Sequence, residues 1–246
     1  MIILVFLRKN HEIKQYILET GEQNIVCTNF REYDVENQKY LREFIGEKSD
    51  TWLHGSFYNK DNLLDKYAID FKQDLYSHED VYFNSCILAN VIGRDLDYNY
   101  MDLFTYKWVL NPNSLSRSFF SKEYFYIEVY LKDYITATTE PFYQALEQSP
   151  DKRGFYTHQV MMGLLHVYFY FESFKYRSGD KFLAENLVHI HNMKTSIHEK
   201  LGMNNSEIIS YIYYNPRLFS NIRRDSSLGS CEFIESESFK DFILKY

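Results

Sequence analysis

The sequence predicts an α/β protein in which a partial mixed sheet with flanking helices, residues 1–121, is followed by a helical region, residues 122–246. Three observations predict this fold. Short β-rich runs alternate with helical stretches up to about residue 110. From Lys122 onward, apolar residues recur at the helical interval instead. No repeat and no low-complexity linker separates the two parts, so we expect the C-terminal half to be packed and ordered.

In the first half, glycines and one Asn-Pro pair mark where the expected elements end. Gly21 closes a helix in which Ile13 and Tyr16 recur at helical spacing, and Asn111-Pro112 stops an aromatic strand. Residues 1–7 are too few for periodicity to decide between strand and helix. We expect a helix at 11–19, a strand at 24–30, a polar helix at 37–45 ending at Gly46, a strand at 51–58, a helical turn at 63–67, a buried helix at 81–92 and a strand at 104–110.

In the second half, the helical period runs from Phe125 to Leu146. Three further helices are expected at 155–175, 180–201 and 206–214, separated by Pro150, the Ser178-Gly179 pair and Gly202. The apolar run at 160–171 is too short to cross a membrane and predicts a buried core helix.

Composition is typical of an ordinary globular enzyme. Of the 246 residues, 45% are hydrophobic and 25% charged, which is enough to bury a real core. The formal net charge of −7 argues against nucleic acid as the main partner. That balance does not exclude a small anionic ligand, because the local site decides such binding.

The cysteines and the N-terminus point to a cytoplasmic protein. Cys27, Cys86 and Cys231 are widely spaced and odd in number, so they form neither a disulfide framework nor a metal cluster. The apolar stretch at 1–7 is short, and its basic residues follow it, which is the wrong order for a signal peptide. We therefore expect a reducing compartment and no transmembrane segment.

A Glu79-Asp80 pair stands directly before the apolar run of the helix expected at 81–92. At a helix N-terminus, backbone N–H groups and the helix dipole stabilise negative charge. A carboxylate held there is rigidly aimed, as a general base must be. The alternative is that both residues are ordinary helix caps, because acidic residues are common at this position.

Four segments in order carry a family resemblance. They are Trp52-Leu53-His54-Gly55, Ile69-Asp70-Phe71, Glu79-Asp80-Val81-Tyr82-Phe83 and Asn111-Pro112-Asn113-Ser114 with Arg117 after it. Together they resemble the second, acceptor-side half of a family 2 glycosyltransferase with the GT-A fold, over residues 24–135. The resemblance implies inverting transfer of a sugar from a nucleotide-sugar to a hydroxyl group of a glycan or another acceptor.

The resemblance also assigns roles to individual residues. It makes Asp80 the general base, with Glu79 orienting the acceptor or a neighbouring group. Trp52 would form a sugar-binding shelf with His54 as hydrogen-bond donor; the alternative is a packed Trp and a partly exposed His. Further substrate-binding residues are expected after the strand at 104–110: Asn113, Ser114 and Arg117. The alternative is that these residues form only a capped turn.

The donor side of such an enzyme is harder to find in this sequence. The family holds the diphosphate on Mn²⁺ or Mg²⁺ with an Asp-x-Asp motif on an earlier strand, but its first βαβ units have no evident counterpart in residues 1–23. The Asp95-Leu96-Asp97 segment follows the Glu-Asp helix, and its polar neighbours favour a solvated turn. The metal ligands therefore stay unidentified.

Three explanations of the missing donor half are open: the chain is a piece of a longer enzyme, a partner supplies that half, or the donor site has been lost. The partners expected are thus a nucleotide-sugar, a glycan acceptor, and either a second copy of the chain or another chain carrying the donor-binding half. The alternative function is a catalytically inactive glycosyltransferase-like module for binding or assembly. The sequence leaves open whether the chain is an active hexosyltransferase.

Overall fold

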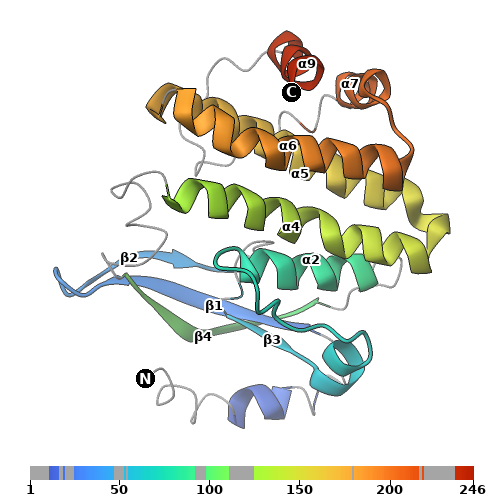
Figure 1. The fold of residues 1–246 in the computed structure, drawn as a ribbon. Coiled ribbons are helices and arrows are strands. Elements are labelled where there is room, and N and C mark those ends of the chain that lie inside the picture. Colours follow the sequence, from blue (N-terminus) through green and yellow to red (C-terminus); the bar gives the residue numbers. More distant parts are fainter. Residues whose placement is uncertain are drawn as a thin grey trace. The chain divides into compact units, whose positions relative to one another are not determined.

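The computed structural model describes residues 11–16, 19, 25–46, 53, 55–91, 98–110, 125–178, 180–215, 218 and 236–246. The chain is mixed α/β and divides into two compact units (Figure 1). The first unit comprises Met1–Lys72 and Phe83–Ser121, and the second comprises Gln73–Tyr82 and Lys122–Tyr246. The division falls inside helix α2 (Glu79–Val91), after Tyr82.

The first unit is built on a four-stranded sheet with β1 (Ile25–Asp34) at its centre. β4 (Tyr98–Leu110) pairs with β1 in parallel along its whole length. β2 (Lys39–Phe44) and β3 (Ser56–Tyr58) pair with β1 antiparallel, β2 with its second half and β3 with its start. Because a strand has only two edges, β2 and β3 share the edge that β4 leaves open. The sheet is therefore mixed, as predicted.

The polar helix expected at 37–45 is wrong, because this segment forms strand β2. Residues 35–38 make the turn of a hairpin, with Gln38 at a φ of 50°. Cross-strand pairs with β1 then outweigh the local helical preference. Phe30 and Phe44 stack at 4.2 Å, and the Nε atoms of Arg31 and Arg42 each lie 2.8 Å from a glutamate oxygen of the opposite strand.

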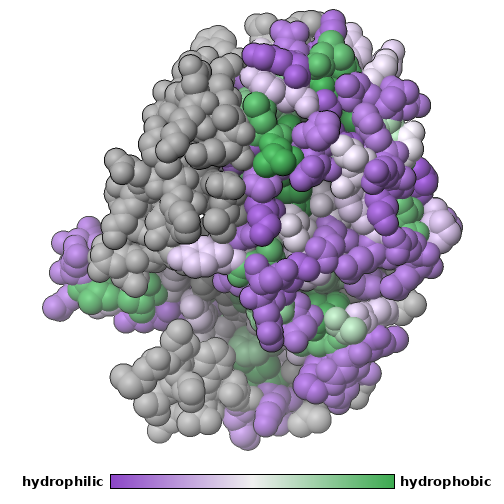
Figure 2. Space-filling view, viewed as in Figure 1, coloured by the Kyte–Doolittle hydropathy of each residue, from purple (hydrophilic) through white to green (hydrophobic). Residues whose placement is uncertain are grey.

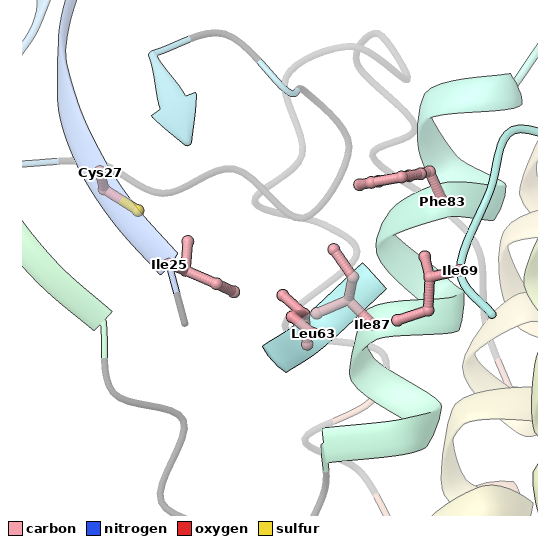
Figure 3. Packing of buried hydrophobic residues seen from close by; sticks show 6 residues of the cluster. All are labelled: Ile25, Cys27, Leu63, Ile69, Phe83 and Ile87. Carbon is pink, nitrogen blue, oxygen red and sulfur yellow. The ribbon is translucent and has the colours of Figure 1, made fainter. Parts of the chain in front are cut away.

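The core of the first unit forms where β1 faces the part of α2 that begins at Phe83 (Figure 3). Side chains from β1, η1 (Lys60–Asp65), the segment after it and α2 point toward one another and are all less than 9% exposed. The cluster consists of Ile25, Cys27, Leu63, Ile69, Phe83 and Ile87. The expected strand at 24–30, the helical turn near 63 and the buried helix after the Glu-Asp pair are thus confirmed.

A buried polar network lies where β4 bulges against β1. The register between the two strands shifts on both sides of Asn29, which is fully buried. Its Nδ2 donates to Asp102 at 2.7 Å, while its Oδ1 accepts from the hydroxyl of Tyr100 and from Gly46 N–H. All the polar atoms of the Asn29 side chain are paired, which fixes the register of β4 on β1.

The second unit is helical, as predicted from the change of period near Lys122. Three long helices pack against one another: α4 (Phe125–Gln148), α5 (Arg153–Ser178) and α6 (Asp180–Leu201). A short 3-10 turn, η2 (Pro150–Lys152), joins the first two. The middle of α5 is buried on nearly all sides, which confirms the core helix expected at 160–171. Gly163 lets α5 approach α4, since a Cβ there would lie 2.9 Å from Thr138 Oγ1.

Two shorter helices complete the described part of the second unit. α7 (Asn205–Tyr214) begins with a capping box formed by Asn204 and Glu207. α9 (Ser236–Lys245), which we did not predict, packs Phe242 against Tyr168 and Phe171 of α5.

Among the described residues on the face shown in Figure 2, hydrophilic side chains predominate, and hydrophobic ones show between them in separate patches. Among the described helices, none has the length and apolar character needed to cross a membrane.

Candidate functional site

The Glu-Asp pair opens helix α2, at the place where the sequence predicted it. The first helical hydrogen bond runs from Tyr82 N–H to the carbonyl oxygen of His78, at 2.9 Å. Glu79 and Asp80 therefore occupy the first turn, where unpaired N–H groups point outward. His78 reaches this position with a φ of 62°, which is uncommon for a residue with a side chain.

The two carboxyl groups of the pair have different surroundings. Glu79 is exposed, whereas Asp80 is partly buried. Burial raises the pKa of Asp80 to about 6, and the negative charge of Glu79 acts in the same direction. The N–H of Val81, which donates to Asp80 Oδ1 at 2.8 Å, opposes the rise. At neutral pH this carboxylate is ionised but more basic than an ordinary aspartate, which suits it to accept a proton.

Helix α4 contacts the segment around the pair at three points, all within the second unit. Asp133 Oδ2 accepts the backbone N–H groups of Tyr76 and Ser77, at 2.8 and 2.9 Å. The rings of His78 and Tyr134 pack edge to face, with centroids 5.1 Å apart. The third contact joins the hydroxyl of Tyr82 to Glu140 Oε1, at 3.4 Å.

These α4 residues were missed in the sequence, although one signal could have indicated Asp133. Leu131, Tyr134 and Ala137 mark the buried face of the expected helix, and Asp133 falls among them. An acidic residue on an apolar helix face needs a donor partner. The pattern could have predicted such a partner, but not that it is the backbone of residues 76 and 77.

His78 carries no charge at neutral pH in the folded protein. Burial lowers the pKa of its imidazole from 6.5 to about 4. A neutral ring packed beside Tyr134 leaves Asp80 without an adjacent imidazolium to hold its pKa down. The raised pKa of Asp80 and the lowered pKa of His78 thus share one cause, the removal of this segment from water.

The other residues assigned to substrate binding lie outside the described part of the chain: Trp52, His54, Asn113, Ser114 and Arg117. Within the Trp-Leu-His-Gly segment, Gly55 is described and has a structural role. Its φ is 69°, its carbonyl oxygen accepts the N–H of Thr28 at 2.7 Å, and a Cβ there would lie 2.7 Å from the Thr28 carbonyl oxygen. The glycine of this motif is therefore required for the approach of β1.

The described residues offer no metal site. No three His, Cys, Asp or Glu side chains in this part of the chain gather closely enough to hold a metal ion. Asp95 and Asp97 lie outside the described residues. The Mn²⁺ or Mg²⁺ that the family resemblance implies thus finds no fitting ligand set among the described residues.

Asn84 is a second polar side chain of α2 that the sequence did not single out. It is 6% exposed, and its Nδ2 has no hydrogen-bond partner among the described residues. Its Oδ1 accepts from the hydroxyl of Tyr58 at 3.4 Å, close to the limit for such a bond. A buried amide donor left unpaired is uncommon, because it forfeits its bonds to water.

Comparison of the chain with protein-family models, curated proteins and solved structures finds no match.

Proposed function

We propose that this chain is the acceptor-side portion of an inverting glycosyltransferase in which Asp80 is the general base. The observation that carries the proposal is the state of Asp80: it stands in the first turn of α2, within the segment that resembles the family motif, and burial raises its pKa to about 6. A helix-capping aspartate on a protein surface has no reason to acquire such a pKa.

The order of elements supports the same proposal. The resemblance expects a strand, a strand carrying the glycine motif, a helix opened by Glu-Asp and an aromatic strand, in that order. β1, β3, α2 and β4 occupy those positions in the chain. The proposal is thus supported by this order and by the local geometry of Asp80.

In the proposed reaction one proton moves, one bond to the anomeric carbon forms and one bond to it breaks. The carboxylate of Asp80 takes the proton of an acceptor hydroxyl group as the hydroxyl oxygen forms a bond to the anomeric carbon of the donor sugar. The bond between that carbon and the nucleoside diphosphate breaks, and the diphosphate leaves with the electron pair. Attack from the face opposite the leaving group inverts the anomeric centre. Glu79, which is exposed beside Asp80, is proposed to orient the acceptor.

The donor is a nucleotide-sugar, and the acceptor is a glycan or another hydroxyl compound. Because residues 1–23 show no counterpart of the family's donor-binding units, we propose that a different chain, which carries those units, supplies them. An inactive binding module would have the same missing half. The two functions differ in one respect: only the enzyme needs a basic Asp80.

The test is a transfer assay with a panel of nucleoside diphosphate sugars and an array of glycan acceptors, with and without Mn²⁺. Calorimetry with the same donors measures their binding to the chain alone. The proposal expects glycan binding, weak or no donor binding by the isolated chain, and sugar transfer once a donor-binding chain is added. Glycan binding that never leads to transfer would favour the inactive module, and the absence of both would contradict the proposal.

A further inference from the structure

The segment that leads into α2 is held by a carboxyl group from α4. Asp133 is 1% exposed, and its Oδ2 accepts three donors from two consecutive residues. These donors are Tyr76 N–H at 2.8 Å, Ser77 N–H at 2.9 Å and the Ser77 hydroxyl at 3.4 Å. A buried carboxyl group needs such partners, because burial without them is strongly unfavourable. The backbone just before the Glu-Asp pair is therefore fixed by the burial of Asp133.

The next residue along the chain is held in an unfavourable conformation. His78 has a φ of 62°, and its ring packs against Tyr134, the neighbour of Asp133 on α4. A residue with a side chain keeps such a conformation only where its surroundings hold it. Beyond the pair, Tyr82 donates to Glu140, whose Oε1 also accepts from Gln144 at 3.0 Å. Contacts to α4 thus lie on both sides of Asp80.

We infer that Asp133 is a positioning residue for Asp80: through its bonds to Tyr76 and Ser77 it sets where α2 begins and thereby where the Asp80 carboxyl group is held. Asp133 acts through the backbone and not by contact with a substrate. The catalytic meaning of this inference rests on the proposed function, but the geometry can be measured without any sugar transfer. It also gives the C-terminal helical region a direct part in the site.

The experiment uses the full chain and three variants. Asp133→Leu removes the acceptor oxygens and keeps the branched shape, Asp133→Asn keeps one acceptor oxygen, and Asp241→Leu is the matched control at an exposed position of α9. The titration midpoint of the Asp80 carboxyl group is followed by ¹³C NMR, and helix content by circular dichroism. Besides Asp80, residues 73–82 and the α4 face that contacts them carry the following acidic and histidine side chains: Asp74, His78, Glu79, Asp133 and Glu140.

In Asp133→Leu, the midpoint of Asp80 is expected to fall from about 6 toward the ordinary value of 3.8, since the released segment admits water, while the helices remain. In Asp133→Asn and Asp241→Leu it should stay near that of the parent chain. A folded Asp133→Leu variant with the parent midpoint would overturn the inference.

A second measurement keeps the inference testable where Asp133→Leu does not fold. In Asp133→Asn, amide hydrogen exchange at Tyr76 and Ser77 should quicken on the order of tenfold, because bonds to a neutral acceptor are weaker than bonds to a carboxylate. Unchanged exchange at both amides would overturn the inference. In a transfer assay, Asp133→Leu should lower kcat more than it changes KM. A parent chain that transfers no sugar even with a donor-binding chain added would contradict the proposed function only, because the NMR result stands apart from it.

Discussion

The imidazole ring of His78 packs edge-on against the phenol ring of Tyr134, with the ring centroids 5.1 Å apart and the planes at 74°. This contact links the residue before the Glu-Asp pair to helix α4, although the two rings are far apart in the sequence. It also removes the imidazole from water, which lowers its pKa to about 4. The protein therefore resists protonation of His78 as long as it stays folded.

His78 should make stability depend on pH. Its folded pKa of about 4 lies below the unfolded value near 6.5, so between these values the unfolded chain binds the extra proton. The contribution of His78 to the free energy of unfolding is fully present above pH 6.5 and is lost as the pH falls toward 4. His78→Asn, which tolerates the positive φ and does not titrate, should remove this dependence, worth about 3 kcal/mol. Urea unfolding at several pH values measures it, and parallel curves for parent and variant would contradict it.

Asp80 should have the opposite effect on stability. Its folded pKa of about 6 lies above the ordinary value of 3.8, so between these values the folded chain holds the extra proton. Ionising the partly buried carboxyl group therefore lowers the free energy of unfolding as the pH rises from 4 to 6. Asp80→Asn keeps an oxygen for Val81 N–H without the charge, and should be more stable than the parent above pH 6 by about 3 kcal/mol. A variant less stable than the parent at pH 7.5 would show that Asp80 is only a helix cap.

The start of α2 could be predicted from the sequence, whereas the way it is held could not. The acidic pair before an apolar run is a local signal, and the helix begins at Glu79 as that signal indicates. The bonds from Asp133 join residues 56 and 57 positions apart, and no local pattern specifies such a partner. The long helices of the second unit were predicted for the same local reason, from their periodicity.

β2 shows the opposite case, in which tertiary pairing overrides a local preference. The residues of this strand favour a helix when considered alone, yet Tyr40 and Phe44 face Tyr33 and Phe30 across the hairpin. The pairing of these aromatic residues acquires meaning only beside β1, because no pattern within 39–44 specifies it. The candidate substrate-binding residues Trp52, His54, Asn113, Ser114 and Arg117 stay predictions, because they lie outside the described residues.

Gly55→Ala should destabilise the first unit. A methyl group there would lie 2.7 Å from the Thr28 carbonyl oxygen, and the backbone has a φ of 69°. Together the close contact and the left-handed conformation should cost about 2 kcal/mol or more. Gly154→Ala is the matched control: a Cβ at that position meets nothing within 4 Å, and the glycine stands in the first turn of α5. Thermal unfolding should rank the control at or above the parent and Gly55→Ala below it; equal losses would refute the structural role of Gly55.

Asn84→Leu should stabilise the protein. The Asn84 side chain is nearly fully buried with its Nδ2 unpaired, so an apolar side chain of similar size removes an unsatisfied donor. The expected gain in the free energy of unfolding is about 1 kcal/mol. The exposed Asn62→Leu provides the control for adding a leucine elsewhere. A lower free energy of unfolding for Asn84→Leu than for the parent would show that the Asn84 amide is paired in solution.

The most direct test of the central claim is sugar transfer by Asp80→Asn as a function of pH. The substitution retains size and the bond to Val81 but removes the basic lone pair, so transfer by the complete enzyme should fall on the order of 10²–10⁴-fold. In the parent, the rate should rise as the pH passes through about 6, where Asp80 ionises, and this step should be absent from the residual activity of the variant. Glu79→Gln should lose less activity and keep the step. Transfer by Asp80→Asn at the parent rate, with the same pH profile, would contradict the assignment of Asp80 as the base.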